Sequence, residues 1–253
     1  FQLYKVFNNM WEAGIFADIF KIGHVCCIYK RSGLKSDKSS WRPVTLLPSL
    51  SKCAEAVMHR RLLSHFIENN VISERQAAYL KGDSTIQQVL YIIHLIRTTW
   101  GKKQIMQGVY LDVSAAFDKA WHKAIIAKLE QIQIKGTALD VFRSYLSNRK
   151  QIVVIGQCKS DIKDVQAGIP QGSRLGPLLW LLYINDIVED LESETLLFAD
   201  DTCIFASGCD PAITTEILNR DLKKISVWAS KWKVLFNPGK TKEIFFSDQL
   251  LAN

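Results

Sequence analysis

The sequence lacks long apolar runs, cysteines at metal-ligand spacing, internal repeats and low-complexity tracts. Its six cysteines show neither a Cys-x-x-Cys pair nor a regular Cys/His spacing, which argues against a zinc site and favours buried thiols in a reducing compartment. The longest apolar run, residues 178–184, is far too short to span a bilayer, and no signal peptide is recognisable. These absences argue against disulfide-stapled, zinc-binding, membrane-spanning and repeat proteins.

What the chain does have is a basic charge and enough apolar residues for a core. With 253 residues and 48% hydrophobic content, it can bury the core of one or two subdomains. The net charge of +7 and the pI near 9.0 suit a polyanionic partner such as nucleic acid. The nature of any site must come from the motifs.

The most informative feature is the adjacent pair Asp200 and Asp201. Apolar β-type runs flank it at residues 196–198 and 204–205, so the pair is expected at the connection of a strand hairpin. Neighbouring carboxylates repel each other, and hard cations such as Mg²⁺ bind carboxylate oxygens. The pair therefore indicates a cation site, unless it is the ordinary solvated turn that an isolated Asp-Asp usually forms.

A second short apolar run, residues 109–111, ends on Asp112. Because an unpaired buried charge is costly, Asp112 is expected at an exposed strand end, beside a cation, or as a cap for residues 114–116. If the two runs are neighbouring strands of one sheet, Asp112 converges with the Asp200 pair. That arrangement predicts the acidic cluster of a two-metal site.

Between these motifs lies a loop rich in glycine and proline, residues 167–177 (AGIPQGSRLGP), followed by the apolar helical run 178–184. Such a loop can bring backbone close to a ligand at a helix start, although most loops of this composition are simple connections. Gln171 adds a side-chain amide that both donates and accepts hydrogen bonds.

Taken in order, residues 110–118 (YLDVSAAFD), 168–172 (GIPQG) and 198–201 (FADD) resemble motifs A, B and C of reverse transcriptases. Residues 172–186 (GSRLGPLLWLLYIND) and 144–149 (SYLSNR) are similar to the non-LTR, LINE-type retrotransposon branch, close to its jockey and CR1-like members. Retroviral, retron and group II intron enzymes carry different residues after the Pro-Gln-Gly core. The resemblance extends over about residues 22–246, and it is specific because several independent motifs occur in the right order.

The resemblance implies that Asp112, Asp200 and Asp201 are catalytic and hold the metal ions. Phe117, five positions after Asp112, falls on the residue whose ring blocks a 2′-hydroxyl and so selects deoxynucleotides. The residues that the resemblance places at the incoming nucleotide are Lys30, Arg42, Ala116, Phe117, Gln171 and Gly172. Lys30 and Arg42 would hold the triphosphate from a fingers hairpin, for which the planar fork of arginine is suited, and the alternative for both is a solvated loop charge.

Residues 237–242 (NPGKTK) resemble motif D, in which a lysine can protonate the leaving pyrophosphate. Lys240 fits the pattern best and Lys242 is the second choice, while a plain surface lysine is the alternative. One departure is Ala78 in residues 76–79 (QAAY), where the family commonly has glycine, and it puts the backbone contact there in doubt.

Hydrophobic periodicity predicts helices over residues 53–66, 85–100, 119–132 and 137–146, and one that starts at Pro211. Ser84 and Asp210 are expected as helix caps, and residues 151–165 as a hairpin. The apolar stripe on the last helix is expected in the core: Ile213, Ile217, Leu218, Leu222, Ile225 and Trp228. The fold class is α+β, by resemblance a right-hand polymerase with an antiparallel palm sheet packed on helices. Fingers would cover about residues 1–103 and 119–165 and the palm about 104–118 and 166–253, with endonuclease and thumb regions outside this chain.

The resulting prediction is an RNA-directed DNA polymerase for retrotransposition that extends a DNA primer on an RNA template by two-metal nucleotidyl transfer. It would use Mg²⁺, with Mn²⁺ as an alternative, and its partners would be RNA template, DNA primer, dNTP and the rest of the retrotransposon polyprotein, without a membrane. The expected location is intracellular, in a cytoplasmic ribonucleoprotein and the nucleus. The alternatives are a decayed, non-catalytic RNA-binding scaffold and a group II intron or retron-type enzyme. The intact residues Asp112, Phe117, Gln171, Asp200 and Asp201 argue against decay.

Overall fold

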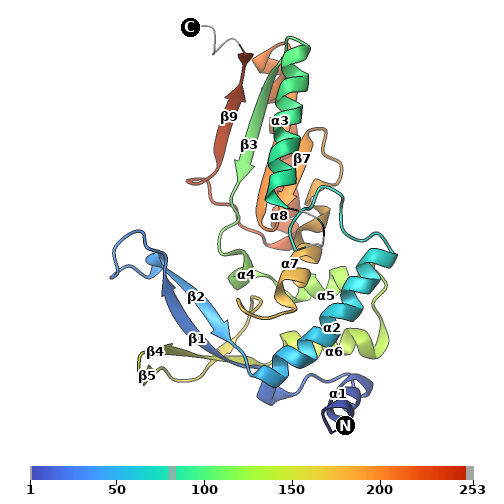
Figure 1. Cartoon of the computed structure of the whole chain (residues 1–253), viewed down its shortest axis with the longest axis vertical. Coiled ribbons are helices and arrows are strands. Elements are labelled where there is room, and N and C mark those ends of the chain that lie inside the picture. Colours follow the sequence, from blue (N-terminus) through green and yellow to red (C-terminus); the bar gives the residue numbers. More distant parts are fainter. Residues whose placement is uncertain (1, 80–81, 83, 249–253) are drawn as a thin grey trace. The chain divides into compact units, whose positions relative to one another are not determined.

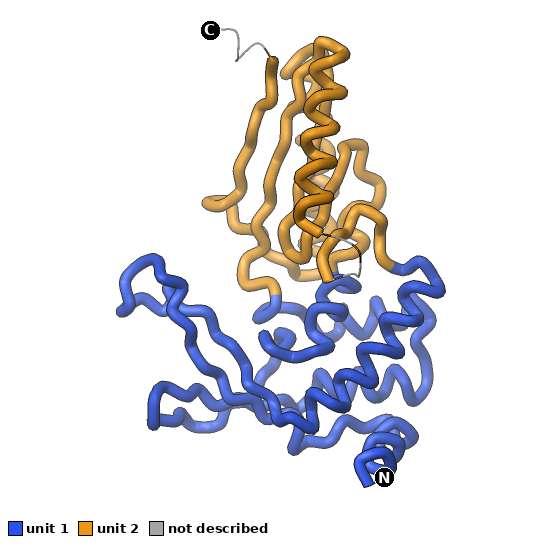
Figure 2. Tube along the Cα trace, viewed as in Figure 1, with its two compact units in different colours: residues 1–71, 117–183 blue, residues 72–116, 184–253 orange. Residues whose placement is uncertain are grey.

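Each of the chain's two units is built around its own β-sheet (Figure 2). The computed structural model describes residues 2–79, 82 and 84–248. Unit 1 comprises Phe1–Val71 and Phe117–Tyr183, and unit 2 comprises Ile72–Ala116 and Ile184–Asn253. The proposed division into fingers and palm stays a prediction, because the two units separate residues by compactness and divide the chain at other positions.

In unit 1, the strands are ordered β2-β1-β4-β5, with β6 paired to β4 (Figure 1). The strands are β1 (Ile22–Tyr29), β2 (Trp41–Leu46), β4 (Arg149–Ile155), β5 (Cys158–Lys159) and β6 (Lys163–Val165). β1 pairs with β2 antiparallel and with β4 parallel, and β4 pairs antiparallel with both β5 and β6. The hairpin predicted over residues 151–165 is therefore present, but as three strands.

The helices of unit 1 follow the predicted pattern with one break, and α1 (Gln2–Glu12) is a helix that the sequence did not predict. The others are α2 (Ser49–Glu68), α4 (Ala116–Lys119), α5 (His122–Gln131), α6 (Gly136–Leu146) and α7 (Gly176–Ile184), with the 3₁₀ turns η1 (Asp18–Phe20) and η2 (Lys38–Ser40). The single helix predicted over residues 119–132 is wrong, since α4 and α5 are separate. The carbonyl of Ala120 accepts the Gly168 N–H at 2.9 Å instead of a helical amide. Every residue of α7 except Pro177 is buried, as expected for a helix that is apolar on all sides.

Unit 2 contains a four-stranded sheet of order β7-β8-β3-β9 in which all pairs are antiparallel. Its elements are α3 (Thr85–Gly101), β3 (Ile105–Leu111), η3 (Asn185–Val188), β7 (Glu194–Phe198), β8 (Asp201–Gly208), α8 (Pro211–Trp232) and β9 (Lys242–Phe246). Successive strand residues point to opposite faces. Met106 packs with apolar residues of α3, whereas the side chain of Gln107 accepts hydrogen bonds from threonine hydroxyls of α8. The sheet therefore lies between α3 and α8 (Figure 1).

The predicted helix caps are confirmed, but the buried face of α8 matches the predicted stripe only in part, at Leu218 and Ile225. Ser84 and Gln87 form a reciprocal capping box at α3, and Asp210 accepts from the Ala212 N–H at 2.8 Å. Ile213 is 53% exposed. The buried residues of α8 are Thr214, Leu218, Asp221, Ile225, Ala229 and Trp232. The helix is rotated from the purely apolar stripe because Thr214 and Asp221 have hydrogen-bond partners in the interior. Within the described residues, no helix combines the length and apolar character needed to cross a membrane.

Candidate active site

Strands β3 and β8 bring three aspartates to one end of the unit 2 sheet. The strands run antiparallel with Leu111 opposite Thr202, so Asp112, just after β3, lies beside Asp201 at the start of β8. Asp200 occupies the turn that joins β7 to β8, in which Phe198 pairs with Asp201. The prediction that these runs are neighbouring strands of one sheet is confirmed.

The charges of this cluster act on one another. Burial raises the pKa of the Asp201 carboxyl, and the negative charges of Asp200 and Asp112 raise it further, while Lys240 opposes them. Burial and the charge of Asp201 together raise the pKa of the Cys203 thiol to about 12. The cluster therefore disfavours additional negative charge and favours a bound cation.

Lys240 supplies one such cation from within the chain. Its Nζ lies 3.3 Å from both Oδ1 and Oδ2 of Asp112. The turn that carries it is fastened to the end of β3, because the Asn237 N–H donates to the Asp112 carbonyl at 2.8 Å and the Lys240 N–H donates to the Asn237 carbonyl at 3.1 Å. Lys242, by contrast, begins β9 opposite Tyr110 and is exposed.

The three carboxylates fit a hard divalent cation by their donor chemistry. Carboxylate oxygens are the ligands that Mg²⁺ and Mn²⁺ prefer, and the cluster contains no sulfur or imidazole donor from these motifs. Among the described residues, no three His, Cys, Asp or Glu side chains are already arranged around a common centre. Lys240 holds Asp112 in its own ion pair, so binding of a divalent ion would require this ammonium to be displaced.

In unit 1, the loop between β6 and α7 is held in a defined conformation. Gln171 Nε2 donates to Asp118 Oδ1 at 3.0 Å, and the Thr45 N–H donates to the Gln171 carbonyl at 2.6 Å. Gly172 has a φ of 121°, and a Cβ there would lie 2.5 Å from the Thr45 carbonyl oxygen. Glycine is therefore required at this position by both backbone conformation and space. His122 fastens the loop's start through a 2.7 Å hydrogen bond with the Gly168 carbonyl.

A cavity of about 350 Å³ lies between this loop and the strands of unit 1. Its lining includes Pro43, Thr45, Asp118 and Gln171. Burial raises the pKa of the Asp118 carboxyl, an effect that the hydrogen bond from Gln171 partly opposes. The loop thus presents a polar amide to a partly open cavity that is large enough for a small planar group.

The remaining predicted nucleotide-binding residues lie in two places: Phe117 is part of a ring stack, whereas Lys30 and Arg42 lie on a hairpin. The half-buried Phe117 ring stacks on Trp180 with a centroid distance of 5.7 Å and an interplanar angle of 28°. Lys30 follows β1, and its Nζ donates to the Ser39 carbonyl at 2.9 Å. Arg42 is exposed in β2 opposite Ile28. Both cations therefore lie on the β1–β2 hairpin, and Ala116 is buried at the start of α4.

Two buried polar residues hold these motifs through contacts that the sequence did not predict. Glu55, fully buried in α2, accepts the backbone N–H groups of Arg174 and Leu175 at 2.7 and 3.2 Å. Gln76 accepts the backbone N–H groups of Ala78 and Ala199, both at 3.0 Å. The sequence shows a carboxylate beside the apolar stripe of α2 for Glu55 and the motif at residues 76–79 for Gln76, and neither pattern identifies a partner more than 100 positions away.

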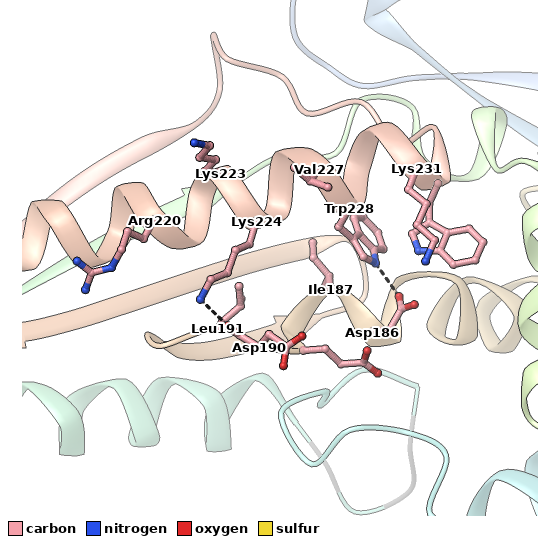
Figure 3. A pocket seen from close by; sticks show the side chains of 12 residues that line it. Asp186, Ile187, Asp190, Leu191, Arg220, Lys223, Lys224, Val227, Trp228 and Lys231 are labelled. Atoms are coloured by element: carbon pink, nitrogen blue, oxygen red, sulfur yellow. Dashed lines mark hydrogen bonds between the residues drawn. The ribbon is translucent and has the colours of Figure 1, made fainter.

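Unit 2 also contains a groove of about 600 Å³ beside α8 (Figure 3). Trp228 Nε1 donates to Asp186 Oδ1 at 2.7 Å, and Lys224 Nζ donates to the Asp190 carbonyl at 2.6 Å. Polar groups on the two sides thus bond to each other. None of the three clustered aspartates lines the groove, so it is separate from the candidate active site.

The chain matches the protein family described as "Reverse transcriptase (RNA-dependent DNA polymerase)" over residues 28–249. It is 30% identical to a Drosophila melanogaster protein named "Probable RNA-directed DNA polymerase from transposon X-element", over 96% of this chain and 27% of that protein. It is 29% identical to "RNA-directed DNA polymerase from mobile element jockey" of the same species, with the same coverage. The chain thus spans about a quarter of the length of these relatives.

Solved telomerase structures share the fold. The structure of apo telomerase from Candida tropicalis truncated from its C-terminal domain gives a TM-score of 0.61 at 14% identity, over 96% of this chain and 54% of that chain. Telomerase from Candida albicans in complex with a fragment of telomeric RNA gives 0.62 at 13% identity, over 96% and 45%. The predicted α+β right-hand polymerase fold is confirmed, and at such identities the likeness concerns the fold alone.

Proposed function

The chain belongs to the reverse transcriptase (RNA-dependent DNA polymerase) family, and from this premise we propose that it extends a DNA primer on an RNA template. The resemblance of its motifs to non-LTR retrotransposon enzymes is confirmed by the family match and by the jockey and X-element relatives. The observation that carries the proposal is the convergence of Asp112, Asp200 and Asp201 at one end of the β3–β8 pair, with Lys240 beside them.

The three aspartates would hold two divalent ions, Mg²⁺ or Mn²⁺. When bound, such ions activate the primer 3′-hydroxyl and stabilise the charge that develops at the α-phosphate and the leaving oxygen. An ionised carboxylate has no proton to donate, whereas the ammonium group of Lys240 has. We therefore assign to Lys240 the protonation of the pyrophosphate leaving group. Its present ion pair with Asp112 shows that its side chain reaches the carboxylates.

Residues of unit 1 would bind the incoming dNTP. Gln171 and Gly172 belong to the fixed loop, and Lys30 and Arg42 offer cationic groups for the triphosphate, where the arginine can bind phosphate oxygens through two donors at once. The Phe117 ring, stacked on Trp180, would exclude a 2′-hydroxyl. The net charge of +7 supports binding to template and primer backbones and predicts salt-sensitive affinity.

The biological role we infer is retrotransposition of a mobile element, with the remainder of a longer polyprotein as a covalent partner. This inference is supported by the names of the relatives, of which this chain spans about a quarter. An intracellular location, in a cytoplasmic ribonucleoprotein and the nucleus, is part of the same proposal.

The test is primer extension on a poly(rA)–oligo(dT) template with Mg²⁺ and dTTP. We expect the wild-type protein to extend the primer, and Asp112→Asn and Asp200→Asn to abolish extension without lowering the melting temperature. Asp161→Asn, in an exposed loop of unit 1, is the matched control and should extend normally. One of the longer relatives, assayed in parallel, shows that the template and buffer support the reaction.

Equal extension by wild type and Asp112→Asn would remove the assignment of the aspartates. Tight binding of the RNA–DNA duplex without any extension, while the longer relative is active, would instead favour a non-catalytic RNA-binding scaffold.

A further inference from the structure

Gln76 links the turn that carries Asp200 to a segment more than a hundred residues earlier in the chain. Its side-chain oxygen accepts the N–H of Ala199, directly before Asp200, and the N–H of Ala78, both at 3.0 Å. Gln76 is 2% exposed, so water does not replace these bonds. Since both partners are N–H donors, the oxygen and not the nitrogen of the amide must face them.

The backbone around Gln76 reinforces this link. Gln76 forms a parallel bridge with Leu197 of β7, through hydrogen bonds from the Ala77 N–H to the Leu197 carbonyl at 3.0 Å and from the Leu197 N–H to the Arg75 carbonyl at 2.9 Å. Residues 75–77 are therefore bound to β7 by an isolated parallel β-bridge. This bridge fixes the position from which the Gln76 side chain reaches the turn.

The turn itself has an unfavourable backbone conformation. Ala199 and Asp200 are the two residues between the paired Phe198 and Asp201, and Ala199 has a φ of 57°. Asp200 is not among the described residues with positive φ. Positive φ at the first of two turn residues is the pattern of a type II′ turn, in which glycine is favoured at that position. An alanine persists there only when its surroundings hold it.

We propose that Gln76 is a positioning residue that holds the Ala199–Asp200 turn in this conformation and so directs the Asp200 carboxylate toward the metal-binding cluster. The inference rests on the proposed function, because it assigns Gln76 a part in the same site. Partners that orient a ligating group commonly affect metal affinity by about 10–100-fold when they are removed. Gln76 would act in this way through the backbone next to the ligand.

Gln107 offers a matched control in the same unit. It is 1% exposed, and its Oε1 accepts from Thr214 Oγ1 at 2.6 Å and Thr215 Oγ1 at 3.1 Å, while its Nε2 donates to Glu243. These bonds join β3 to α8 and β9, and none of them reaches the turn. Replacing either glutamine with methionine keeps the side-chain length and removes the amide, so a general loss of packing or hydrogen bonding should affect both variants alike.

The experiment measures Mn²⁺ binding directly, by water-proton relaxation, in wild type, Gln76→Met and Gln107→Met. We expect Gln76→Met to raise the Mn²⁺ dissociation constant by about 10–100-fold and Gln107→Met to leave it unchanged. Adding Ala199→Gly to Gln76→Met should recover part of the affinity, because glycine adopts positive φ without strain. If Gln76→Met does not fold by its melting curve, Gln76→Asn, which withdraws the amide by one methylene group, is judged by the same comparison.

Wild-type affinity in a folded Gln76→Met protein would overturn the inference, and so would an equal loss in Gln107→Met or no gain from Ala199→Gly. Primer extension at varied Mn²⁺, run on the same samples, separates the two claims. A wild type that binds Mn²⁺ but extends no primer contradicts the proposed function alone. A wild type that extends primers, with a Gln76→Met variant of unchanged Mn²⁺ requirement, contradicts the role of Gln76 alone. A wild type that does not bind Mn²⁺ contradicts both.

Discussion

Replacing Lys240 with methionine separates two roles that the structure gives to this side chain. The ammonium lies 3.3 Å from both oxygens of Asp112, so it competes with a divalent ion for that carboxylate. It is also the assigned proton donor to the leaving pyrophosphate. Methionine keeps most of the length of the side chain and removes the charge and the proton.

The two roles predict changes of different size and opposite direction. The Lys240 side chain is 66% exposed, and exposed ion pairs contribute at most about 1 kcal/mol. Removing the competing ammonium should therefore lower the Mg²⁺ concentration for half-maximal rate by about fivefold at most. Losing a general acid should lower the maximal rate by about 10²–10⁴-fold. A protein that is merely damaged would lose rate without binding Mg²⁺ more easily.

The assay is single-turnover extension of a DNA primer at saturating dNTP over a range of Mg²⁺ concentrations. Lys242→Met is the matched control, since Lys242 is an exposed lysine at the start of β9. A lower Mg²⁺ requirement with an unchanged maximal rate in Lys240→Met would show that Lys240 is only a counter-ion. A loss of rate in Lys242→Met alone would transfer the proton-donor role to Lys242.

Three further predictions concern stability and selectivity. Because the folded-state pKa of Asp201 is raised, the stability of the Mg²⁺-free protein should fall as pH rises from about 4 through that pKa. The Asp201→Asn variant should show a weaker pH dependence, melt at a higher temperature at pH 7 and lose primer extension. An unchanged pH profile of the melting temperature would contradict this reasoning. Burial likewise raises the pKa of Glu55, so Glu55→Gln should reduce the loss of stability that occurs as pH rises above about 4.5. Glu55→Ala should instead lower the free energy of unfolding by about 1–3 kcal/mol for each of the two backbone amides left unpaired, measured by denaturant titration. Phe117→Ala should lower the ratio of kcat/KM for dNTP over rNTP, and an unchanged ratio in a folded variant would make the ring a packing residue for Trp180 alone.

Local signals in the sequence predicted most of the helices and the end of the sheet at which the aspartates meet. Asp112 and Asp201 follow from apolar runs that end or begin on an acid, and the caps Ser84 and Asp210 follow from residues that accept backbone N–H groups. These features depend on residues within a few positions of one another. Periodicity and capping therefore suffice for them.

The features that the sequence did not predict depend on partners far apart in the chain. The parallel pairing of β1 with β4 and the hydrogen bonds from the residue 174–175 amides to Glu55 join segments separated by more than a hundred residues. On α8, Asp221 is buried because it accepts the backbone N–H groups of Glu192 and Ser193. An apolar-stripe rule cannot include such a residue, because its burial is decided by a partner that the helix's own sequence does not contain.

The mutual repulsion of the clustered carboxylates supports the location of the active site. Among the described residues, two other buried charged groups have polar partners but no like charge beside them: Glu55 accepts two backbone N–H groups, and Lys21 lies 2.9 Å from Asp18 Oδ1. At the β7–β8 turn, by contrast, burial and then the negative charges of Asp200 and Asp112 raise the pKa of the Asp201 carboxyl, and Ala199 has a positive φ of 57°. Lys240 balances only part of the negative charge there. Because the charges of Asp200 and Asp112 disfavour ionisation of Asp201, a bound cation stabilises this turn, which is the property that a metal-dependent polymerase needs.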